Sequence, residues 1–595
     1  MLRTRPRLRE VLVALVLTPL YLLCRGYVFG TRDHAIHLAY IERMVDPGFL
    51  AGDPLLEVAA HHPSFFFAAL AGLSRLVPLE ALYFAGHVLS VFAMILGLRA
   101  LARRLWDGPA GEWAAAVAVA GAFVHRYVAG SIENLDAMFL PRVASLGPLL
   151  WALELGVRGR FGRAFALTGA VFLVHAPTAA HTAFVLWVGC AFGGRANLRH
   201  CLLGPVLFLA AASPLLFWMA VHGGPEVPSP APVEWVQSLK LHHAFHHFAI
   251  PWIPAGRAAA AAMAILLGVA VSRWRGAGAL LAGFLAGAAG LIVAGGIGNW
   301  GFSWPVTIHL HLFEAGRLLD YLAVVALGRW SYSVFHGPWP TKAVGVLILA
   351  AYALRIPLHE WVRHRFVPDF YVLAAALAVT LLVRREFPGR RRLAAHRLGG
   401  ILRREGLRPP PRRQAGGFAA GLGAALVVVS VAAGRMPEWN PTGAGYPGYR
   451  MMRWARDHLP AEAVVIVPPY IEGAIPTFRH FARRRVVGSW KDGGEGTFNH
   501  AFQLSWEQQV RDISGVGASL RVPDGPVNWA DYAAWIRGAV ESYHTMPAEH
   551  FIAMGRRYGA SHVVRQAGAL RIGLPVLYED EEYVLQELPD PGARR

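Results

Sequence analysis

The residues best suited to chemistry follow the first apolar stretch of the chain, in a short polar loop. Asp33 and His34 lie there, a few residues beyond Phe29. Ionisable groups beside an apolar layer are costly to desolvate, so they are seldom accidental. A carboxylate in such a position can accept a proton from a hydroxyl group, and burial can raise its pKa toward a useful value. Asp33 is therefore a candidate catalytic base, with His34 as a candidate catalytic partner that orients it.

The same loop also allows a purely structural interpretation. Residues 34–44 are expected to form a helix, and aspartate is a common residue directly before a helix, where its side chain caps the free backbone amides. His34 and His37 lie one helical turn apart, so they are candidates for a metal or for ordinary hydrogen bonds at the interface. Capping and chemistry remain open alternatives for Asp33.

A second acidic cluster follows about one hundred residues later and contains Glu133, Asn134 and Asp136. Carboxylate and amide oxygens are the ligands that Mg²⁺ and Mn²⁺ prefer, so Glu133 and Asp136 are candidate metal ligands. Arg142 comes shortly afterwards, and its guanidinium is suited to binding a phosphate. The alternative for this segment is a solvated loop that leads into a helix.

Further cations stand at other expected loop positions. Arg317 precedes Asp320 by three residues in an apolar helix, so it forms either an internal pair or a phosphate contact. Near the carboxyl end, Arg479, Trp490 and Lys491 combine basic and aromatic groups. Such groups bind phosphate and stack on sugar rings, and they also occur on ordinary solvated strands.

The composition defines the elements that must position these residues. The 595 residues are 55% hydrophobic and only 16% charged, whereas soluble domains average about 25% charged. The sequence therefore predicts an integral membrane protein with many spans. The net charge of +19 comes almost entirely from arginine. These arginines cluster between apolar stretches, as in cytoplasmic loops, and no nucleic-acid motif accompanies them.

The arginine pattern predicts how the chain crosses the bilayer. An arginine-rich start keeps the amino end in the cytoplasm, so the first helix, residues 8–29, brings Asp33 to the outer face. The next apolar stretch, residues 63–77, is too short to cross, and residues 79–98 return the chain to Arg99 and Arg103. Residues 1–435 are expected to contain about 13 spans.

Residues 436–595 are richer in acidic residues and turn signals, and they predict a separate extracytoplasmic α/β domain. Short apolar runs at 463–467, 485–488, 561–564 and 582–585 are typical of strands. Residues 450–458 and 548–558 are expected to be helices, the second ending at Gly559. Helices that alternate with short apolar strands indicate a small α/β fold.

The arrangement resembles the GT-C superfamily of membrane glycosyltransferases, which use polyprenyl-phosphate-linked sugars. The resemblance depends on the arginine-rich first helix, the acidic loop at Asp33, the segment from His62 to Phe66 before a short apolar stretch, and the Arg103-Arg104 end of the next crossing. It implies a multi-span GT-C-like fold with an outer carboxyl-terminal domain, and a catalytic or acceptor-positioning role for Asp33. Many members have an acidic pair there, whereas here His34 follows Asp33.

The sequence therefore predicts a bacterial inner-membrane glycosyltransferase that acts at the outer face. The bacterial source is inferred from a bias toward arginine, alanine and glycine, which indicates a G+C-rich genome. Its expected partners are the bilayer, a polyprenyl-phosphate-linked sugar and an unidentified acceptor. For the cofactor, Mg²⁺ or Mn²⁺ and no cofactor at all are the open alternatives. A transporter or lipid flippase and a non-catalytic scaffold are the alternatives. A cavity at the outer membrane face, lined jointly by Asp33, by Glu133 or Asp136, and by an arginine, would favour the enzyme, and its absence would favour the transporter or the scaffold.

Overall fold

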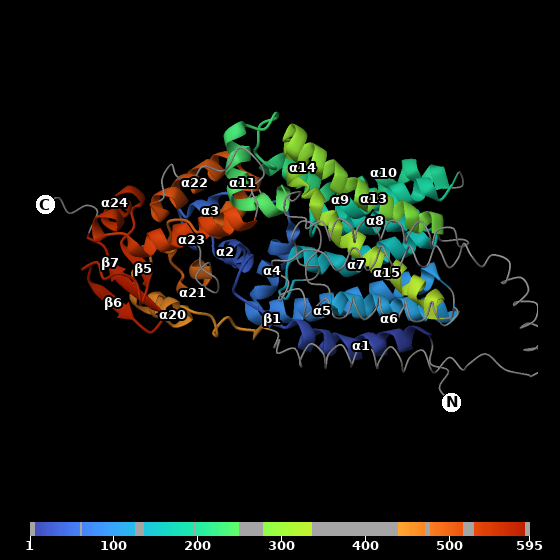
Figure 1. Ribbon diagram of the computed structural model, residues 1–595, viewed down its shortest axis with the longest axis horizontal. Coiled ribbons are helices and arrows are strands. Elements are labelled where there is room, and N and C mark those ends of the chain that lie inside the picture. The colour runs from blue at the N-terminus through green and yellow to red at the C-terminus, as the bar shows by residue number, and fades with distance from the viewer. Residues whose placement is uncertain are drawn as a thin grey trace, which may run out of the picture.

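The computed structural model describes residues 6–59, 62–106, 108–124, 136–194, 197–248, 278–335, 438–469, 477–515 and 529–589. One half of the molecule is a bundle of long helices, and the other half holds a β-sheet with helices around it (Figure 1). The helices of the bundle are α1 (Pro6–Arg25), α5 (Leu79–Leu105), α6 (Gly108–Val124), α7 (Pro141–Val157), α8 (Phe161–Phe172), α9 (Ala176–Phe192), α10 (Leu198–His222), α13 (Gly278–Gly296), its continuation η5 (Ile297–Phe302), and α15 (Gly316–Phe335).

The bundle has the character of a membrane protein. Among the described residues, three helical stretches are long and apolar enough to cross a bilayer: Leu79–Leu105, Leu198–His222 and Gly278–Phe302. Large apolar side chains point outward, as Phe217 does with 72% of its surface exposed. The predicted count of about 13 spans is not confirmed. Four of the apolar stretches that this count includes, at 258–271, 343–354, 370–383 and 418–433, lie outside the described residues.

The short apolar stretch at 63–77 forms α4 (Phe65–Ser74), a helix of 10 residues. A helix of this length is about 15 Å long, half the thickness of the hydrocarbon core. Ser64 caps it by accepting a hydrogen bond from the Phe66 amide at 3.2 Å, and the Ser64 hydroxyl donates to the Val174 carbonyl at 2.7 Å. The prediction that this segment is too short to cross is therefore confirmed.

The direction of α5 agrees with the predicted threading. Arg99, near the end of α5, donates to Glu10 at the start of α1 at 3.0 Å, and Arg103 also pairs with Glu10. The end of α5 therefore lies beside the amino end of α1, and the two helices run in opposite directions. Helix α2, which Asp33 directly precedes, lies at the opposite end of the bundle (Figure 1). Which end faces the cytoplasm stays a prediction.

Helices α5 and α7 pack closely because small residues lie between them. A Cβ atom on Gly97 of α5 would come within 2.8 Å of Leu150, and one on Gly147 of α7 would come within 2.6 Å of Ala93. Small residues allow helix backbones to approach in a membrane, where van der Waals packing drives association. This contact fixes the position of α7, whose first turn carries Arg142.

Polar loops and short elements gather at the end of the bundle that faces the sheet (Figure 1). These elements are α2 (His34–Val45), α3 (Pro54–Glu57), α4, α11 (Val233–His247), α14 (Pro305–His309) and η6 (Leu312–Ala315). Directly after α1, β1 (Tyr27–Val28) pairs in parallel with β2 (Trp439–Asn440). The chain after residue 437 is thus joined to the first loop by a backbone ladder.

The second half contains a five-stranded sheet in the order β4-β3-β5-β7-β6. Strands β3, β4 and β5 are parallel, whereas β7 is antiparallel to both β5 and β6. The elements are β3 (Val464–Ile466), β4 (Arg485–Val486), β5 (His562–Gln566), β6 (Val576–Glu579), β7 (Tyr583–Glu587), α20 (Tyr449–His458), α21 (Phe478–Ala482), η8 (Trp490–Thr497), α22 (His500–Ser514), α23 (Trp529–Thr545) and α24 (Ala548–Tyr558).

All four strands and both helices expected in this region are present at the expected positions. Strand β6 was not predicted, because it is an edge strand on which Val576 and Leu577 are exposed, and it lacks the buried apolar run of the others. Helices α22 and α23 were also not predicted. The boundary at 436 and the independence of residues 436–595 as a domain stay predictions.

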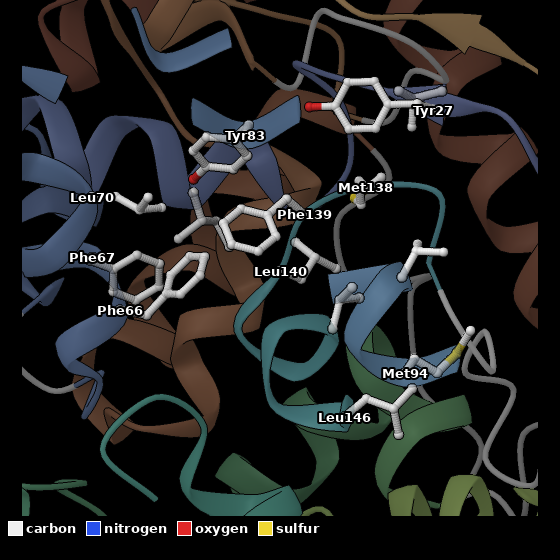
Figure 2. Close-up of a cluster of buried hydrophobic side chains, with 14 of the residues drawn as sticks. Tyr27, Phe66, Phe67, Leu70, Tyr83, Met94, Met138, Phe139, Leu140 and Leu146 are labelled. Atoms are coloured by element: carbon white, nitrogen blue, oxygen red, sulfur yellow. The ribbon is translucent and has the colours of Figure 1, made fainter. Parts of the chain in front are cut away.

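An aromatic core lies between the bundle and the polar loops. Phe139 packs against Phe66 at 5.1 Å and edge-on against Tyr83 at 5.7 Å between ring centroids. Figure 2 shows Phe139 among these rings, with Met138 and Leu140 on either side of it in the chain. Burial of these three consecutive side chains anchors the segment that connects Asp136 to Arg142.

Candidate functional site

Asp33 directly precedes α2, but its side chain makes no capping hydrogen bond. One carboxylate oxygen instead lies 2.8 Å from Nη1 of Arg142, and the other lies 2.5 Å from Nζ of Lys491. The capping alternative therefore does not describe this carboxylate. Asp33 joins three segments that are far apart in the sequence: the first loop, the start of α7 and the turn η8.

The charged cluster continues from Arg142 to two further residues. Arg142 donates from Nε and Nη2 to both oxygens of Asp136, each at 2.9 Å, and Arg317 donates to the same carboxylate at 3.2 Å. Arg317 thus pairs with Asp136 in the buried interior. We call these five residues, Lys491, Asp33, Arg142, Asp136 and Arg317, the charged cluster.

The two carboxylates of the charged cluster are held in their charged form. Burial raises the pKa of Asp33, but Lys491 and Arg142 outweigh burial and hold that pKa well below its usual range. Burial likewise raises the pKa of Asp136, and Arg142 and Arg317 bring it below the usual range. The expectation that desolvation would leave Asp33 with a raised pKa is wrong for this state, because two cations contact the carboxylate directly.

Local sequence positions Arg142 at the cluster. Pro141 is the first residue of α7, where its missing amide costs nothing and its fixed φ favours the helix. Leu140, directly before it, is extended, and Met138, Phe139 and Leu140 are anchored in the aromatic core, so the first turn of α7 begins at a fixed point (Figure 2). Arg142 can therefore reach back to Asp136 and across to Asp33.

His34 is fully buried and does not contact the Asp33 carboxylate. Its Nδ1 accepts a hydrogen bond from the Gly30 amide at 3.1 Å, which leaves the proton on Nε2 for donation to the Phe139 carbonyl at 3.1 Å. The neutral ring thus ties the first loop to the segment that carries Asp136 and Arg142. Burial lowers the pKa of His34 to about 4.

This lowered pKa predicts an acid-dependent loss of stability. The folded chain favours neutral His34, so its contribution is complete above the ordinary pKa of 6.5 and is lost as the pH falls toward about 4. The loss amounts to at most about 3 kcal/mol. Between these pH values, the midpoint of thermal unfolding should therefore fall less steeply with decreasing pH in His34→Gln than in wild type. Parallel profiles would contradict a buried neutral His34.

The predicted metal site is only partly within the described residues. Glu133 and Asn134 lie outside them, and both oxygens of Asp136 accept hydrogen bonds from Arg142. Within the described part of the chain, no group of three or more histidine, cysteine, aspartate or glutamate side chains is arranged to hold a metal. Metal binding by Glu133 and Asp136 stays a prediction.

Of the three predicted contacts near the carboxyl end, only Lys491 lies in the charged cluster. Arg479 is buried and forms ion pairs with Asp53 and Asp492, both at 2.8 Å. Trp490 is also buried and packs edge-on against Trp506. Arg479 and Trp490 therefore contact protein groups, where the sequence analysis expected a phosphate and a sugar ring.

A second polar group, which the sequence analysis did not assign to the site, adjoins the charged cluster. Nδ1 of His62 lies 3.1 Å from Glu495, and Nδ1 of His311 lies 3.7 Å from Glu314. The Phe498 ring lies near both histidines, at centroid distances of 5.1 and 6.4 Å. His311 and Glu314 stand three residues apart, so local spacing could have suggested that pair. Nothing in the sequence pairs His62 with Glu495, which lies 433 residues later.

Comparison with known proteins gives similarities of fold. A family model described as a domain of unknown function, DUF6798, matches residues 447–513. No curated protein sequence matches the chain.

Two crystal structures of ArnT from Cupriavidus metallidurans are similar at a TM-score of 0.47 and 15% identity. The one bound to undecaprenyl phosphate covers 99% of both chains, and the apo form covers 98% of this chain and 97% of the other. The apo oligosaccharyltransferase of Archaeoglobus fulgidus is similar at a TM-score of 0.42 and 11% identity, over 95% of this chain and 70% of the other. These likenesses are too distant to transfer an activity or a residue role.

Proposed function

We propose that this protein is a GT-C-type membrane glycosyltransferase that moves a sugar from a polyprenyl-phosphate-linked donor to an acceptor at the outer face of a bacterial inner membrane. The observation that carries the proposal is the position of Asp33, whose carboxylate lies between Arg142 and Lys491 at 2.8 and 2.5 Å. Transfer from a lipid phosphate requires a base for the acceptor and cations for the leaving phosphate, and this site offers both.

The geometry supports an exchange of partners when the donor binds. Arg142 and Lys491 hold the anionic Asp33 in the free protein, and a phosphate offers the same cations more negative charge and more acceptor oxygens. Once the phosphate has taken these contacts, the pKa of Asp33 rises because its nearest positive charges are shared. Asp33 then becomes a stronger base at the moment when the donor is in position.

The chemical step follows from this arrangement. Asp33 accepts the proton of the acceptor hydroxyl, the acceptor oxygen forms a bond to the anomeric carbon, and the bond from that carbon to the phosphate oxygen breaks. The phosphate leaves with the bonding electron pair, and Arg142 and Lys491 stabilise its charge. Arg317 donates to the same oxygen of Asp136 as Nε of Arg142 does, and it thereby holds that carboxylate and, through it, Arg142.

The proposed Mg²⁺ or Mn²⁺ ion would require Glu133 and Asp136. Asp136 already accepts hydrogen bonds from Arg142 on both oxygens, so this donor set does not suit a cation while Arg142 remains in position. No step above is routed through a metal. Transfer measured before and after dialysis against a chelator, with Mg²⁺ or Mn²⁺ restored separately, tests the requirement.

The proposal is tested by sugar transfer from a panel of polyprenyl-phosphate-linked sugars, using the purified full chain. Wild type is expected to release polyprenyl phosphate and glycosylate an acceptor from a cell-envelope extract. Lys491→Gln should reduce the rate by about tenfold or more, because it removes one of two cations at the phosphate. Lys240→Gln, a lysine substitution on α11, is the matched control and should retain the wild-type rate.

Two outcomes would contradict this function. Absence of both transfer and binding across the panel would exclude a polyprenyl-phosphate donor. Movement of a labelled lipid across liposomes containing the protein, without any glycosylated product, would instead favour the transporter or flippase. A non-catalytic scaffold would show neither sugar transfer nor lipid movement, and Lys491→Gln would not change either measurement.

A further inference from the structure

Arg479 is the centre of a second ion-pair group, beside the charged cluster but separate from it. Its Nε donates to Asp53 at 2.8 Å, and its two terminal nitrogens donate to the two oxygens of Asp492 at 2.8 and 2.9 Å. The three side chains have relative exposures of 1%, 0% and 3%. Buried charges that are fully paired with one another offer no free group to a substrate, so this group needs another explanation.

Asp492 fixes the turn that carries Lys491. It accepts hydrogen bonds from both the backbone amide and the hydroxyl of Ser489, at 3.0 and 2.8 Å, and these bonds close the start of η8. On the other side of Lys491, Trp490 packs against Trp506, whose indole nitrogen donates to the Ser489 carbonyl at 2.8 Å. Lys491 is therefore held between two anchored residues.

Asp53 connects the same group to the segment that follows α2, the helix that Asp33 precedes. Its second oxygen accepts the Leu55 amide at 3.1 Å and so caps α3. Thr477, two residues before Arg479, donates to the Gly30 carbonyl at 2.6 Å, three residues before Asp33. The stretch from Gly30 to Asp53 and the segment from 477 to 497 are thus joined at two points besides the contact between Asp33 and Lys491.

We propose that Arg479 is a positioning residue: by binding Asp53 and Asp492 together, it holds the Lys491 ammonium against the Asp33 carboxylate. The guanidinium is suited to this role because it forks onto one carboxylate with two nitrogens and still has a third for another. Arg479 acts through Lys491 and makes no contact with the substrate. Its consequence for sugar transfer rests on the proposed function, whereas its effect on Lys491 does not.

Lysine acylation tests the effect on Lys491 without requiring any enzymatic activity. The chain has only three lysines, Lys240, Lys342 and Lys491, so an amine-reactive acetyl ester can be followed at each of them by peptide mass spectrometry. In wild type, Lys491 should react slowly because its ammonium is paired with Asp33. In Arg479→Gln, acylation of Lys491 relative to Lys240 should rise about tenfold, the factor that corresponds to about 1.4 kcal/mol of lost pairing.

Arg484→Gln is the matched control for this experiment. Arg484 is also buried, in the same segment, but donates to backbone carbonyls such as those of Arg456 and Arg483. Its substitution should leave Lys491 acylation within about twofold of wild type, whatever it does to stability. If Arg479→Gln does not fold, Asp492→Asn serves as a milder second variant. It should also raise the acylation of Lys491.

A double-mutant cycle separates positioning from general stabilisation. If Arg479 acts through Lys491, Arg479→Gln should slow transfer in the wild-type background and have little further effect in Lys491→Gln, whereas Arg484→Gln should have the same effect in both backgrounds. Unchanged Lys491 acylation in folded Arg479→Gln and Asp492→Asn would overturn the proposal. Absence of transfer by wild type would refute the proposed function, and the acylation result would still decide the role of Arg479.

Discussion

Replacing Asp33 by asparagine is expected to lower sugar transfer by about 10²–10⁴-fold, the usual contribution of a general base. The same change should strengthen binding of polyprenyl phosphate, which is an unusual pair of effects for one substitution. Asparagine keeps the shape of the side chain but carries no charge. It therefore cannot accept the acceptor proton as a carboxylate does.

The tighter binding follows from the contacts of the free protein. Asp33 is an internal anion that occupies Arg142 and Lys491 at 2.8 and 2.5 Å, so a phosphate must displace it. An asparagine at this position would compete weakly, because a neutral amide oxygen forms a weaker bond with a cation than a carboxylate does. We expect a gain of about tenfold in affinity, equivalent to about 1.4 kcal/mol.

Binding and transfer should be measured on the same preparations. The binding ligand is a short polyprenyl monophosphate, with the corresponding alcohol and inorganic phosphate as comparisons that separate the lipid from the phosphate group. Asp46→Asn is the matched control, because Asp46 is an exposed aspartate of the same loop that accepts a bond from the Gly48 amide. Equal turnover in wild type and Asp33→Asn would exclude Asp33 as the base, and weaker binding in Asp33→Asn would exclude the exchange of partners.

Asp136→Ala is expected to have the largest effect on stability, a loss of about 3–5 kcal/mol. Asp136 is 5% exposed and is the shared counter-ion of Arg142 and Arg317. Its removal leaves Arg317, which is 3% exposed, without the only ion pair found for it in the described part of the chain. A buried cation without a partner is more costly than the loss of one favourable contact.

Thermal unfolding of the purified protein in detergent, at one heating rate, measures this loss as a lower midpoint. Asp136→Asn should be milder than Asp136→Ala, because an amide oxygen can still accept a bond from one arginine. Asp46→Ala should change stability by no more than about 0.5 kcal/mol, as expected for an exposed site. A midpoint of Asp136→Ala equal to that of wild type would show that the two arginines do not depend on this carboxylate.

Local sequence patterns predicted helices and strands well where the apolar residues of the pattern are also the buried ones. The apolar runs that became β3, β4, β5 and β7 have buried side chains facing the core, whereas the missed β6 is an exposed edge strand without such a run. In the first half, the short segment before α5 was predicted from its length alone. The count of spans could not be predicted in this way. Length and hydropathy indicate which segments are apolar, but they do not indicate how each segment lies in the bilayer.

The candidate site was predicted in part. Asp33, Asp136, Arg142, Arg317 and Lys491 were each singled out from the sequence, and the structure brings them together. Arg479 and Trp490 had the same kind of signal but are buried against other protein groups. Residue type indicates what a side chain is able to bind, and only its neighbours determine whether it is free to do so.

The sequence by itself determined that this chain forms apolar helices with charged residues at their ends, because hydropathy and charge are properties of neighbouring residues. The tertiary structure alone decided that Asp33 faces Arg142 and Lys491 and that its pKa is lowered where burial alone would raise it. The physical reason is that Coulomb interactions depend on distance in space, and these three charges come from segments that only folding brings together.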